Sequence, residues 1–587
     1  MVGRRDKVKV SVQQGVRQQE GRTERMGPRF LGTLVTDLDS RIDAATDVAA
    51  LSTLEISSVA YRSTDVLPNG LFVCIPGERA DGHDFALEAA ERGAAALVVE
   101  HSVPVDLPQI HFDNTRLALA QIARNFYDDP SNELTITAVT GTNGKTTTTY
   151  LVDWICRYHL DRALGLEGET AGEATTTAVA IAAAPATVST GLIGTVETRI
   201  GTTRLPSKFT TPESLDLQKL LADMRDQGVS HVSMETSSHA IALHRVSGVN
   251  FAVAVFTNLT QDHLDFHKTM EEYFEAKAAL FDSPLVAKRV IDIDTEAGRR
   301  LVARCRQNGF EPITCGCADD AQIRAIQVRY SDESTTFDLI TPKGNQMVTY
   351  SLIGGFNVSN VLCACAAVLA LGIPLGDIAG ALASTPQIPG RLERVLAKSL
   401  APQDSKQPPV RVFVDYSHTP DSICKALEAL NEIKTAGTII VFGCGGDRDR
   451  TKRPLMGKAA LEADYAIVTS DNPRTEDPQR IIEDILPGMA AGIDRYEVEP
   501  DRRTAIAKAL CRANEGDLVL IAGKGHEDYQ LVGDKVLDFD DRVVAAEELS
   551  SLAHSGHWAA PVAVPGQSDQ PIPQGENPHA NPDIGGA

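Results

Sequence analysis

The stretch ITAVTGTNGKTT, residues 136–147, decides the fold of the central part of this chain. An apolar, strand-like run leads into a glycine-rich turn, and a helix pattern begins at Lys145 and Thr146. Backbone amides in such a turn point at a phosphate, the lysine neutralises phosphate oxygens, and the threonine hydroxyl binds magnesium. The spacing G-x-x-G-K-T is shorter than the usual G-x-x-x-x-G-K-T, and a glycine-rich turn without a ligand is the alternative. Because a strand precedes it and a helix follows it, we predict a phosphate loop that binds ATP through Gly141, Thr142, Asn143, Gly144, Lys145, Thr146 and Thr147.

Strand and helix patterns alternate on both sides of this loop, which is typical of an α/β protein. Strands are expected at 70–75, 95–100, 135–139, 229–234, 251–256, 410–414, 438–442, 465–469 and 518–521, and helices at 85–93, 146–158 and 270–281. These elements group into three compact regions, 31–132, 133–386 and 387–553, the last of them a nucleotide-fold-like unit.

Three segments lack the large apolar residues that a packed core needs. Residues 1–30 are polar and basic, and we expect a disordered tail there, or an upstream extension of a chain that starts at Met26. Residues 554–587 are rich in Pro and Gly, and we expect them to be disordered. Residues 163–189 are almost all Ala, Thr, Gly and Glu, which predicts an inserted loop or a mobile helix.

The composition excludes several classes of protein. A net charge of −23 argues against binding to nucleic acid or to an anionic membrane, which both require a basic surface. The ten cysteines are scattered and do not form a metal-binding or disulfide pattern. The basic N-terminus has no apolar core of a secretory signal. The apolar stretch 361–373 is too short to span a bilayer and indicates a buried helix. We therefore expect a cytoplasmic protein without membrane insertion.

Two further strand ends in the central region carry metal-binding residue types. Glu235 follows the strand at 229–234, and His263 follows the strand at 251–256. Ligands of open α/β sheets bind where strands end, and magnesium prefers carboxylate and phosphate oxygens. A single histidine at a strand end is more often structural than a ligand, but its place in this cluster favours a role. We predict that Glu235, His263 and Thr146 form a magnesium site.

Lys277 lies on the apolar face of the helix expected at 270–281. Burial disfavours the charged form of a lysine and lowers its pKa. A neutral amine can react with carbon dioxide to form a carbamate, an anion that can bind magnesium. The pattern alone favours the alternative, in which the side chain extends to solvent.

Several motifs of this chain resemble those of the Mur ligase family, in the same order and over about residues 55–550. They are 140–147, Glu235, His263, the YFEAK segment ending at Lys277, FNVSN at 356–360, GRLE at 390–393 and DYSHTP at 415–420. The resemblance implies a UDP-sugar-binding N-terminal domain, a central ATPase-type domain and a Rossmann-like C-terminal domain. It also implies that Asn357, Asn360, Arg391 and Asp415 line the ATP site, and that Lys277 is carbamylated. Lys145, Lys277, His263 and Glu235 then become the predicted catalytic residues.

Within the family, Asp471-Asn472-Pro473-Arg474 is similar to the recognition motif of the members that add diaminopimelate. An arginine binds the distal carboxylate of that amino acid in bidentate fashion, and lysine lacks this group. An Asn-Pro turn before a helix is the alternative for this tetrapeptide. The resemblance also assigns Arg448, Gly523 and Glu527 to the amino acid.

The nucleotide-sugar side of the resemblance is less regular. Ser63 matches a uridine-binding serine, and the loop 77–83 matches a diphosphate-side loop. Contacts with the muramyl peptide are implied for Thr210, Thr211, Ser237 and Arg245. The usual Asp-Ser-Arg is replaced here by Arg62-Ser63-Thr64, and Leu243 and Phe209 stand where some relatives carry Gln and Asn.

The function implied by this resemblance is ATP-dependent addition of meso-2,6-diaminopimelate to the D-glutamyl γ-carboxylate of UDP-N-acetylmuramoyl-L-alanyl-D-glutamate. The predicted cofactors are ATP and Mg²⁺, the predicted partners are these small molecules, and we expect a monomer. Lysine-adding and other Mur-type ligases, folylpolyglutamate synthase, a P-loop kinase and a nucleotide-gated binding protein are the alternatives.

Overall fold

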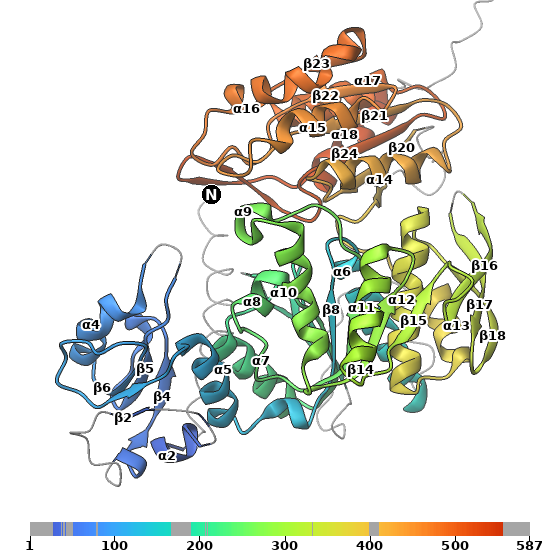
Figure 1. Ribbon diagram of the computed structural model, residues 1–587. Coiled ribbons are helices and arrows are strands. Elements are labelled where there is room, and N and C mark those ends of the chain that lie inside the picture. Colours follow the sequence, from blue (N-terminus) through green and yellow to red (C-terminus); the bar gives the residue numbers. More distant parts are fainter. Residues whose placement is uncertain are drawn as a thin grey trace, which may run out of the picture.

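The computed structural model describes residues 27–36, 38, 41–42, 51–77, 80–165, 189–205, 207, 209–331, 333–397 and 410–555. Three main sheets, built from successive segments of the chain, form three units (Figure 1). Most of the predicted tails and insert, residues 1–26, 166–188 and 556–587, lies outside the described residues.

The N-terminal unit holds a five-stranded sheet in the order β2-β7-β6-β5-β4. Its strands are β2 (Arg41–Ile42), β4 (Ser58–Ala60), β5 (Gly70–Val73), β6 (Ala94–Val99) and β7 (Gln109–His111), and its helices include α2 (Leu31–Leu34), α4 (Ala86–Glu91) and α5 (Thr115–Phe126). A separate pair joins β1 (Arg29–Phe30) to β3 (Glu55–Ile56), so regular structure begins inside the segment expected to be a tail.

The central unit is built on an eleven-stranded sheet in the order β11-β10-β9-β12-β8-β13-β14-β15-β16-β17-β18. The strands are β8 (Thr135–Thr140), β9 (Ser189–Ile193), β10 (Thr198–Ile200), β11 (Thr203–Leu205), β12 (Val229–Glu235), β13 (Phe251–Phe256), β14 (Val286–Asp292), β15 (Ile313–Gly316), β16 (Ile323–Tyr330), β17 (Thr335–Thr341) and β18 (Gly344–Tyr350). β8 lies between β12 and β13 and is parallel to both. The carboxyl ends of these three strands therefore meet at one edge of the sheet.

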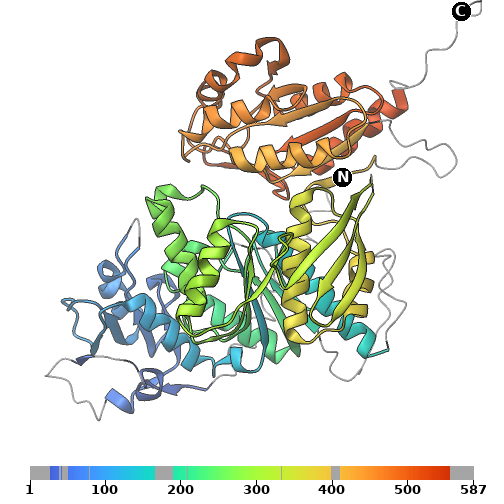
Figure 2. The ribbon, with the colours of Figure 1, turned by 45° about the vertical axis from the view of Figure 1, so that its right-hand side comes forward.

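Helices cover both faces of this sheet (Figures 1 and 2). They are α6 (Lys145–Ala163), α7 (Ser214–Asp226), α8 (Ser238–Ala242), α9 (Leu264–His267), α10 (Met270–Asp282), α11 (Glu296–Gln307), α12 (Gly355–Leu371) and α13 (Leu375–Ala383). α12 confirms the buried helix expected at 361–373, because nearly all of its side chains lie in the core. Among the described residues, no helix is both long and apolar enough to cross a membrane.

The C-terminal unit contains a six-stranded sheet in the order β19-β20-β24-β21-β22-β23, with five parallel strands and an antiparallel β19 at one edge. The strands are β19 (Glu393–Val395), β20 (Arg411–Asp415), β21 (Thr438–Phe442), β22 (Tyr465–Val468), β23 (Tyr496–Val498) and β24 (Leu518–Ala522). The helices are α14 (Pro420–Asn431), α15 (Lys452–Ala460), α16 (Pro478–Ile485), α17 (Arg502–Arg512) and α18 (Asp541–Ser555). The predicted nucleotide-fold-like unit is confirmed, and in both views it lies above the central sheet (Figures 1 and 2).

A buried ion pair joins α17 to α18 in the C-terminal unit. The Arg502 guanidinium donates to both oxygens of Asp541, each at 2.7 Å, and neither side chain is exposed. Arg502 also donates to the carbonyl of Ala522, at the end of β24. A charge left unpaired in such a place costs far more than the loss of an exposed pair.

We predict that Asp541→Ala lowers the free energy of unfolding of the C-terminal unit by about 3–5 kcal/mol. The measurement is hydrogen exchange of the amides in α17 and α18. The matched control is Arg503→Ala, since Arg503 forms an exposed pair with Glu547 and its loss should cost under about 1 kcal/mol. Equal losses in the two variants would contradict the prediction.

Candidate active site

The phosphate loop connects β8 to α6 and depends on two glycines. Gly141 and Gly144 have positive φ angles of 154° and 82°. A Cβ on Gly144 would overlap with the Oδ1 atom of Asn360, and one on Gly141 would overlap with the Thr257 hydroxyl. Glycine is therefore required at both positions by backbone conformation and by close packing.

Lys145 begins α6 and curls back over the loop. Its Nζ atom donates to the carbonyls of Gly141, at 3.0 Å, and Thr142, at 2.8 Å. Burial lowers the pKa of this lysine, while the nearby carboxylates of Glu235 and Asp262 act in the opposite direction. The structure thus brings Lys145 and Glu235 close enough for their charges to interact.

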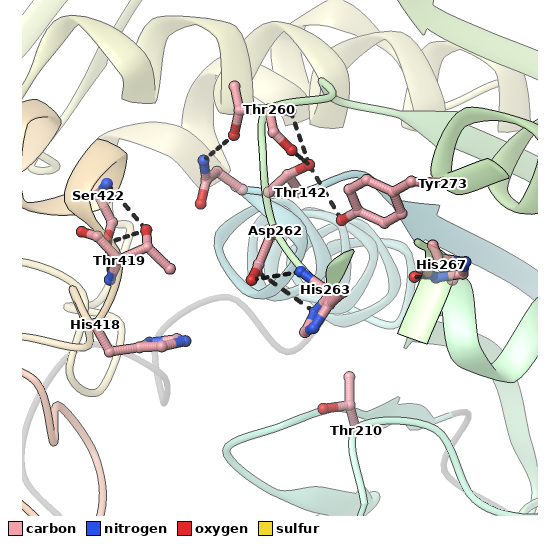
Figure 3. Close-up of polar contacts among 12 residues, drawn as sticks. Thr142, Thr210, Thr260, Asp262, His263, His267, Tyr273, His418, Thr419 and Ser422 are labelled. Carbon is pink, nitrogen blue, oxygen red and sulfur yellow. Dashed lines mark hydrogen bonds and ion pairs between the residues drawn. The ribbon is translucent and has the colours of Figure 1, made fainter. Parts of the chain in front are cut away.

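Of the candidate metal ligands, Glu235 is the last residue of β12, and His263 lies in the segment that follows β13. The Glu235 side chain is almost fully buried, and its oxygens accept from the amide and the hydroxyl of Thr195 at 2.8 and 3.1 Å. His263 packs edge-on against His239, and its Nε2 lies 3.5 Å from Asp262 (Figure 3). Burial lowers the pKa of His263. Within the part of the chain that the structure describes, no group of three or more His, Cys, Asp or Glu side chains is placed to hold a metal.

Lys277 on α10 points into the protein. Only 1% of the residue is exposed, so the alternative in which its side chain extends to solvent is wrong. Its Nζ atom donates to the carbonyl of Gly141 at 2.9 Å and lies 4.5 Å from the centre of the Tyr273 ring. Burial holds the pKa of Lys277 well below its usual value, and the positive charge of Lys145 lowers it further. The structure therefore brings Lys277 to the phosphate loop with a lowered pKa.

Residues from distant parts of the chain converge on the same loop. Arg391 donates to the Thr146 hydroxyl at 2.8 Å, and its guanidinium lies over the Tyr416 ring. Asn360 packs on Gly144 and donates to Asn357 at 2.9 Å. Asp415 accepts the backbone amide of Leu392 at 2.7 Å, and burial raises its pKa against the effect of Arg391. All four residues that the resemblance assigned to ATP thus lie around the loop or next to Arg391.

The residues assigned to the amino acid form a second group in the C-terminal unit. Arg474 donates to the carbonyl of Gly446 at 2.9 Å. Asn472 donates to Glu527 at 2.8 Å, and burial together with the charge of Asp471 raises the pKa of Glu527. A Cβ on Gly523 would overlap with the Asp471 carboxylate, whose Oδ2 is buried and has no hydrogen-bond partner. Pro473 shapes the turn, and its carbonyl accepts the amide of Glu476.

One cavity of about 1270 Å³ joins the central and C-terminal units. Its lining includes Asp262, His263, His418, Arg448, Asp471, Asn472, Arg474, Gly523 and Glu527. Figure 3 shows His263 and His418, which both line this cavity, reaching into it from the two sides. The cavity therefore connects the loop side of the central sheet to the predicted amino-acid pocket.

The residues predicted to bind the muramyl peptide fall into two places. Thr210 contacts Thr195, the partner of Glu235, with 3.0 Å between the hydroxyls. Thr211 donates to the Glu235 carbonyl and accepts the Ser237 amide. Arg245 donates to the carbonyl of Thr211 at 3.2 Å.

Ser63 stands apart from this group, in the N-terminal unit, where it donates to Glu88 at 2.9 Å. The structure therefore brings the predicted muramyl-peptide residues together and leaves the predicted uridine contact in the first unit.

Three segments match Mur ligase domains. Residues 55–127 match the description "Mur ligase family, catalytic domain", residues 170–368 "Mur ligase middle domain", and residues 391–525 "Mur ligase, glutamate ligase domain". The UDP-N-acetylmuramoyl-L-alanyl-D-glutamate–2,6-diaminopimelate ligase of Geobacillus thermodenitrificans is 44% identical, over 84% of this chain and 94% of the relative. The chain belongs to the Mur ligase family. The ligase of the same name from Listeria monocytogenes serotype 4b is 43% identical to this Mur ligase, over 86% and 97% of the two chains.

Solved structures share this fold. A structure of a UDP-N-acetylmuramoyl-L-alanyl-D-glutamate–2,6-diaminopimelate ligase superposes with a TM-score of 0.61 at 29% identity, covering 90% of this Mur ligase and 99% of that chain. The MurF ligase of Thermotoga maritima, solved in complex with ADP, gives a TM-score of 0.53 at 20% identity, over 85% and 97% of the two chains. The three-unit architecture predicted from the sequence is confirmed.

The sequence patterns did not predict a hairpin that holds the segment 471–474 of this Mur ligase. The hairpin consists of β25 (Tyr529–Val532) and β26 (Lys535–Asp538). Arg474 exchanges backbone hydrogen bonds with it, donating to Leu531 and accepting from Gly533, and Asn472 accepts from the Leu531 amide. The signal was present, because a Gly-Asp pair stands between two alternating strand patterns. The hairpin fixes Arg474 at a positive φ of 53°.

We predict that Gly144→Ala weakens nucleotide binding by at least about tenfold, because alanine at this positive φ is strained by about 1–2 kcal/mol and its Cβ meets Asn360. Titration calorimetry with ADP measures the effect. Gly376→Ala is the control, since a Cβ at that helical glycine meets nothing within 4 Å. Unchanged ADP affinity in Gly144→Ala would contradict the role of the loop.

Proposed function

We propose that this Mur ligase joins meso-2,6-diaminopimelate to the D-glutamyl γ-carboxylate of UDP-N-acetylmuramoyl-L-alanyl-D-glutamate, with hydrolysis of ATP to ADP and phosphate. The observation that carries the proposal is the single cavity that runs from His263, beside the phosphate loop, to Arg474 and Glu527. The alignments with the relatives that bear this enzyme name cover nearly the whole length of those relatives.

The first step is phosphoryl transfer. The γ-carboxylate attacks the γ-phosphorus of ATP, the bond to the β-phosphate oxygen breaks, and an acyl phosphate and ADP form. Lys145 offsets the charge on the transferring group, and Arg391, which contacts Thr146 at 2.8 Å, adds a second cation from the other unit. Because the C-terminal unit covers the loop, water is kept away from the reactive acyl phosphate.

The second step forms the amide bond. The amine of diaminopimelate attacks the acyl carbon, phosphate leaves, and one proton is lost from nitrogen. We assign this proton to Nε2 of His418, since Nδ1 must donate to the Tyr416 carbonyl at 2.8 Å. Burial and the charge of Lys452 lower the pKa of His418, which keeps the ring neutral and able to accept a proton.

Selection of the amino acid falls to the C-terminal unit. The guanidinium of Arg474 matches a distal carboxylate, which diaminopimelate has and lysine lacks. Asp471 and Glu527 offer carboxylates to the two ammonium groups, and the unpartnered Oδ2 of Asp471 is a ready acceptor. A lysine in this pocket would leave Arg474 without a partner, so we propose that the enzyme rejects it.

The residues present fit magnesium that arrives with the nucleotide. Magnesium is held by one or two carboxylates together with substrate phosphates, so a cage of several acidic side chains is unnecessary. We propose Glu235, Thr146, His263 and a carbamate on Lys277 as the protein ligands. When bound, magnesium neutralises charge on the phosphate oxygens. Lys277 suits the carbamate because it is buried beside Gly141 with a depressed pKa.

The remaining proposed contacts are those with the UDP-linked substrate. We propose that Ser63 binds uridine and that Thr210, Thr211, Ser237 and Arg245 bind the muramyl peptide. Because ATP and UDP-linked precursors are cytoplasmic, we propose that the enzyme acts in the cytoplasm, as a monomer and without nucleic acid.

The direct test of the proposed function incubates the purified protein with the UDP-muramyl dipeptide, ATP and a panel of diamino acids. Product mass identifies the amino acid added, and a lysine product would overturn the proposal.

We predict that Arg474→Ala raises the KM for diaminopimelate by about tenfold to a hundredfold, because a charge-assisted pair is lost. The KM for ATP should stay nearly unchanged. Steady-state phosphate release measures both constants. Arg480→Ala is the charge-matched control, since Arg480 lines the same cavity but its side chain is exposed to solvent. Equal increases in both KM values would remove the specificity argument.

We predict that Lys277→Ala lowers kcat at least about tenfold, and that acetate or formate restores part of it by replacing the carbamate oxygens near magnesium. The measurement is activity against added acid, with wild type and the exposed-lysine variant Lys219→Ala as controls. A Lys277→Ala enzyme that is fully active, or inactive without any response to acid, would exclude the carbamate.

A further inference from the structure

Asp421, in the first turn of α14, contacts the tip of the phosphate loop from the other unit. Its Oδ2 atom accepts from the side-chain amide of Asn143 at 2.9 Å and from the Thr260 hydroxyl at 3.3 Å. The same oxygen accepts from Lys425 at 2.9 Å. In Figure 1, α14 lies on the lower side of the C-terminal unit, facing the end of the central sheet where α6 begins.

The backbone and the side-chain nitrogen of Asn143 are held by protein groups. Its amide donates to the Asn258 side chain at 2.9 Å, and its carbonyl accepts from Thr257 at 2.6 Å and from Asn258 at 3.2 Å. Its side-chain nitrogen donates to Asp421 and to Thr260. The central unit therefore holds the backbone of Asn143, while Thr260 of the central unit and Asp421 of the C-terminal unit share its side chain. This residue contributes to the shape of the loop rather than to a direct grip on phosphate.

The Asp421 carboxylate is well positioned for this contact. α14 starts with a capping box in which Thr419 and Ser422 bond to each other's backbone amides, which fixes the first turn. A carboxylate in the first turn is stabilised by the helix dipole. Lys425, one turn later, neutralises the negative charge that would otherwise stand near a phosphate site.

The unit that carries Asp421 also carries the amino-acid pocket. A second contact of the same kind joins Arg391 to Thr146, two residues beyond Gly144. Since these contacts form only when the C-terminal unit is docked, the conformation of the loop and the docking of this unit favour each other. We propose that Asp421 is a positioning residue that couples docking of the C-terminal unit to the conformation of the phosphate loop. The proposal rests on the proposed function only in that the loop binds ATP.

The test measures the affinity of AMPPNP with magnesium by titration calorimetry, without amino acid or muramyl substrate. Asp421→Ala should weaken binding about threefold to tenfold, since one partly exposed charge-assisted contact is lost. Asp421→Asn should keep most of the affinity, because its amide oxygen still accepts from Asn143. Glu428→Ala, an exposed carboxylate on the same helix, is the matched control and should bind as wild type does.

A double-mutant cycle separates this role from general stability. In an Asn143→Ala background, Asp421→Ala should change the affinity by less than about twofold, because the partner is already absent. The proposal would be overturned if the effects of Asn143→Ala and Asp421→Ala on the AMPPNP affinity multiplied, or if Asp421→Ala bound as wild type does. Thermal melting checks that each variant is folded. If the wild-type protein added lysine, the proposed amino-acid substrate would be wrong, but the proposed role of Asp421 would stand. One that fails to bind AMPPNP would overturn both.

Discussion

The meeting of three strand ends at one edge of the central sheet is the constraint on which the whole site depends. β8, β12 and β13 run in parallel, so the loop at 140–147, Glu235 and the segment 257–263 emerge side by side. Gly141 and Gly144 let the loop turn tightly enough for Thr257 and Asn360 to pack directly against it. Lys277 from α10 and Arg391 from the C-terminal unit then contact the loop at this edge.

Electrostatics within the site differ from those of the chain as a whole. The protein carries a net charge of −23, yet Lys145, Lys277 and Arg391 gather around the loop. Burial lowers the pKa of both lysines, and the charge of Lys145 lowers the pKa of Lys277 further. A triphosphate site is thus built locally by a few cations and backbone amides, independently of the surface charge.

What the sequence predicted well was local. The loop, the strands at 251–256 and 438–442 and the buried helix at 361–373 follow from short-range patterns of glycine and apolar residues. The burial of Lys277 was misjudged from the helix pattern alone, because it depends on the packing of α10 against the loop. Asp421 gave no signal at all, since its partner Asn143 lies far away along the chain. Contacts between units are set by docking, which a one-dimensional pattern does not encode.

The pairing of Arg502 with Asp541 has a consequence for how the protein is made. Arg502 also donates to the carbonyl of Ser470, directly before the loop that carries Arg474. Asp541 begins α18, the last described helix. During synthesis on the ribosome the strand edge that carries the phosphate loop can assemble early, whereas the pocket around Arg474 must wait until Asp541 has emerged. A nascent chain therefore gains the phosphate loop first, then Arg391 and Asp421, which contact that loop, and only last the fixed pocket around Arg474.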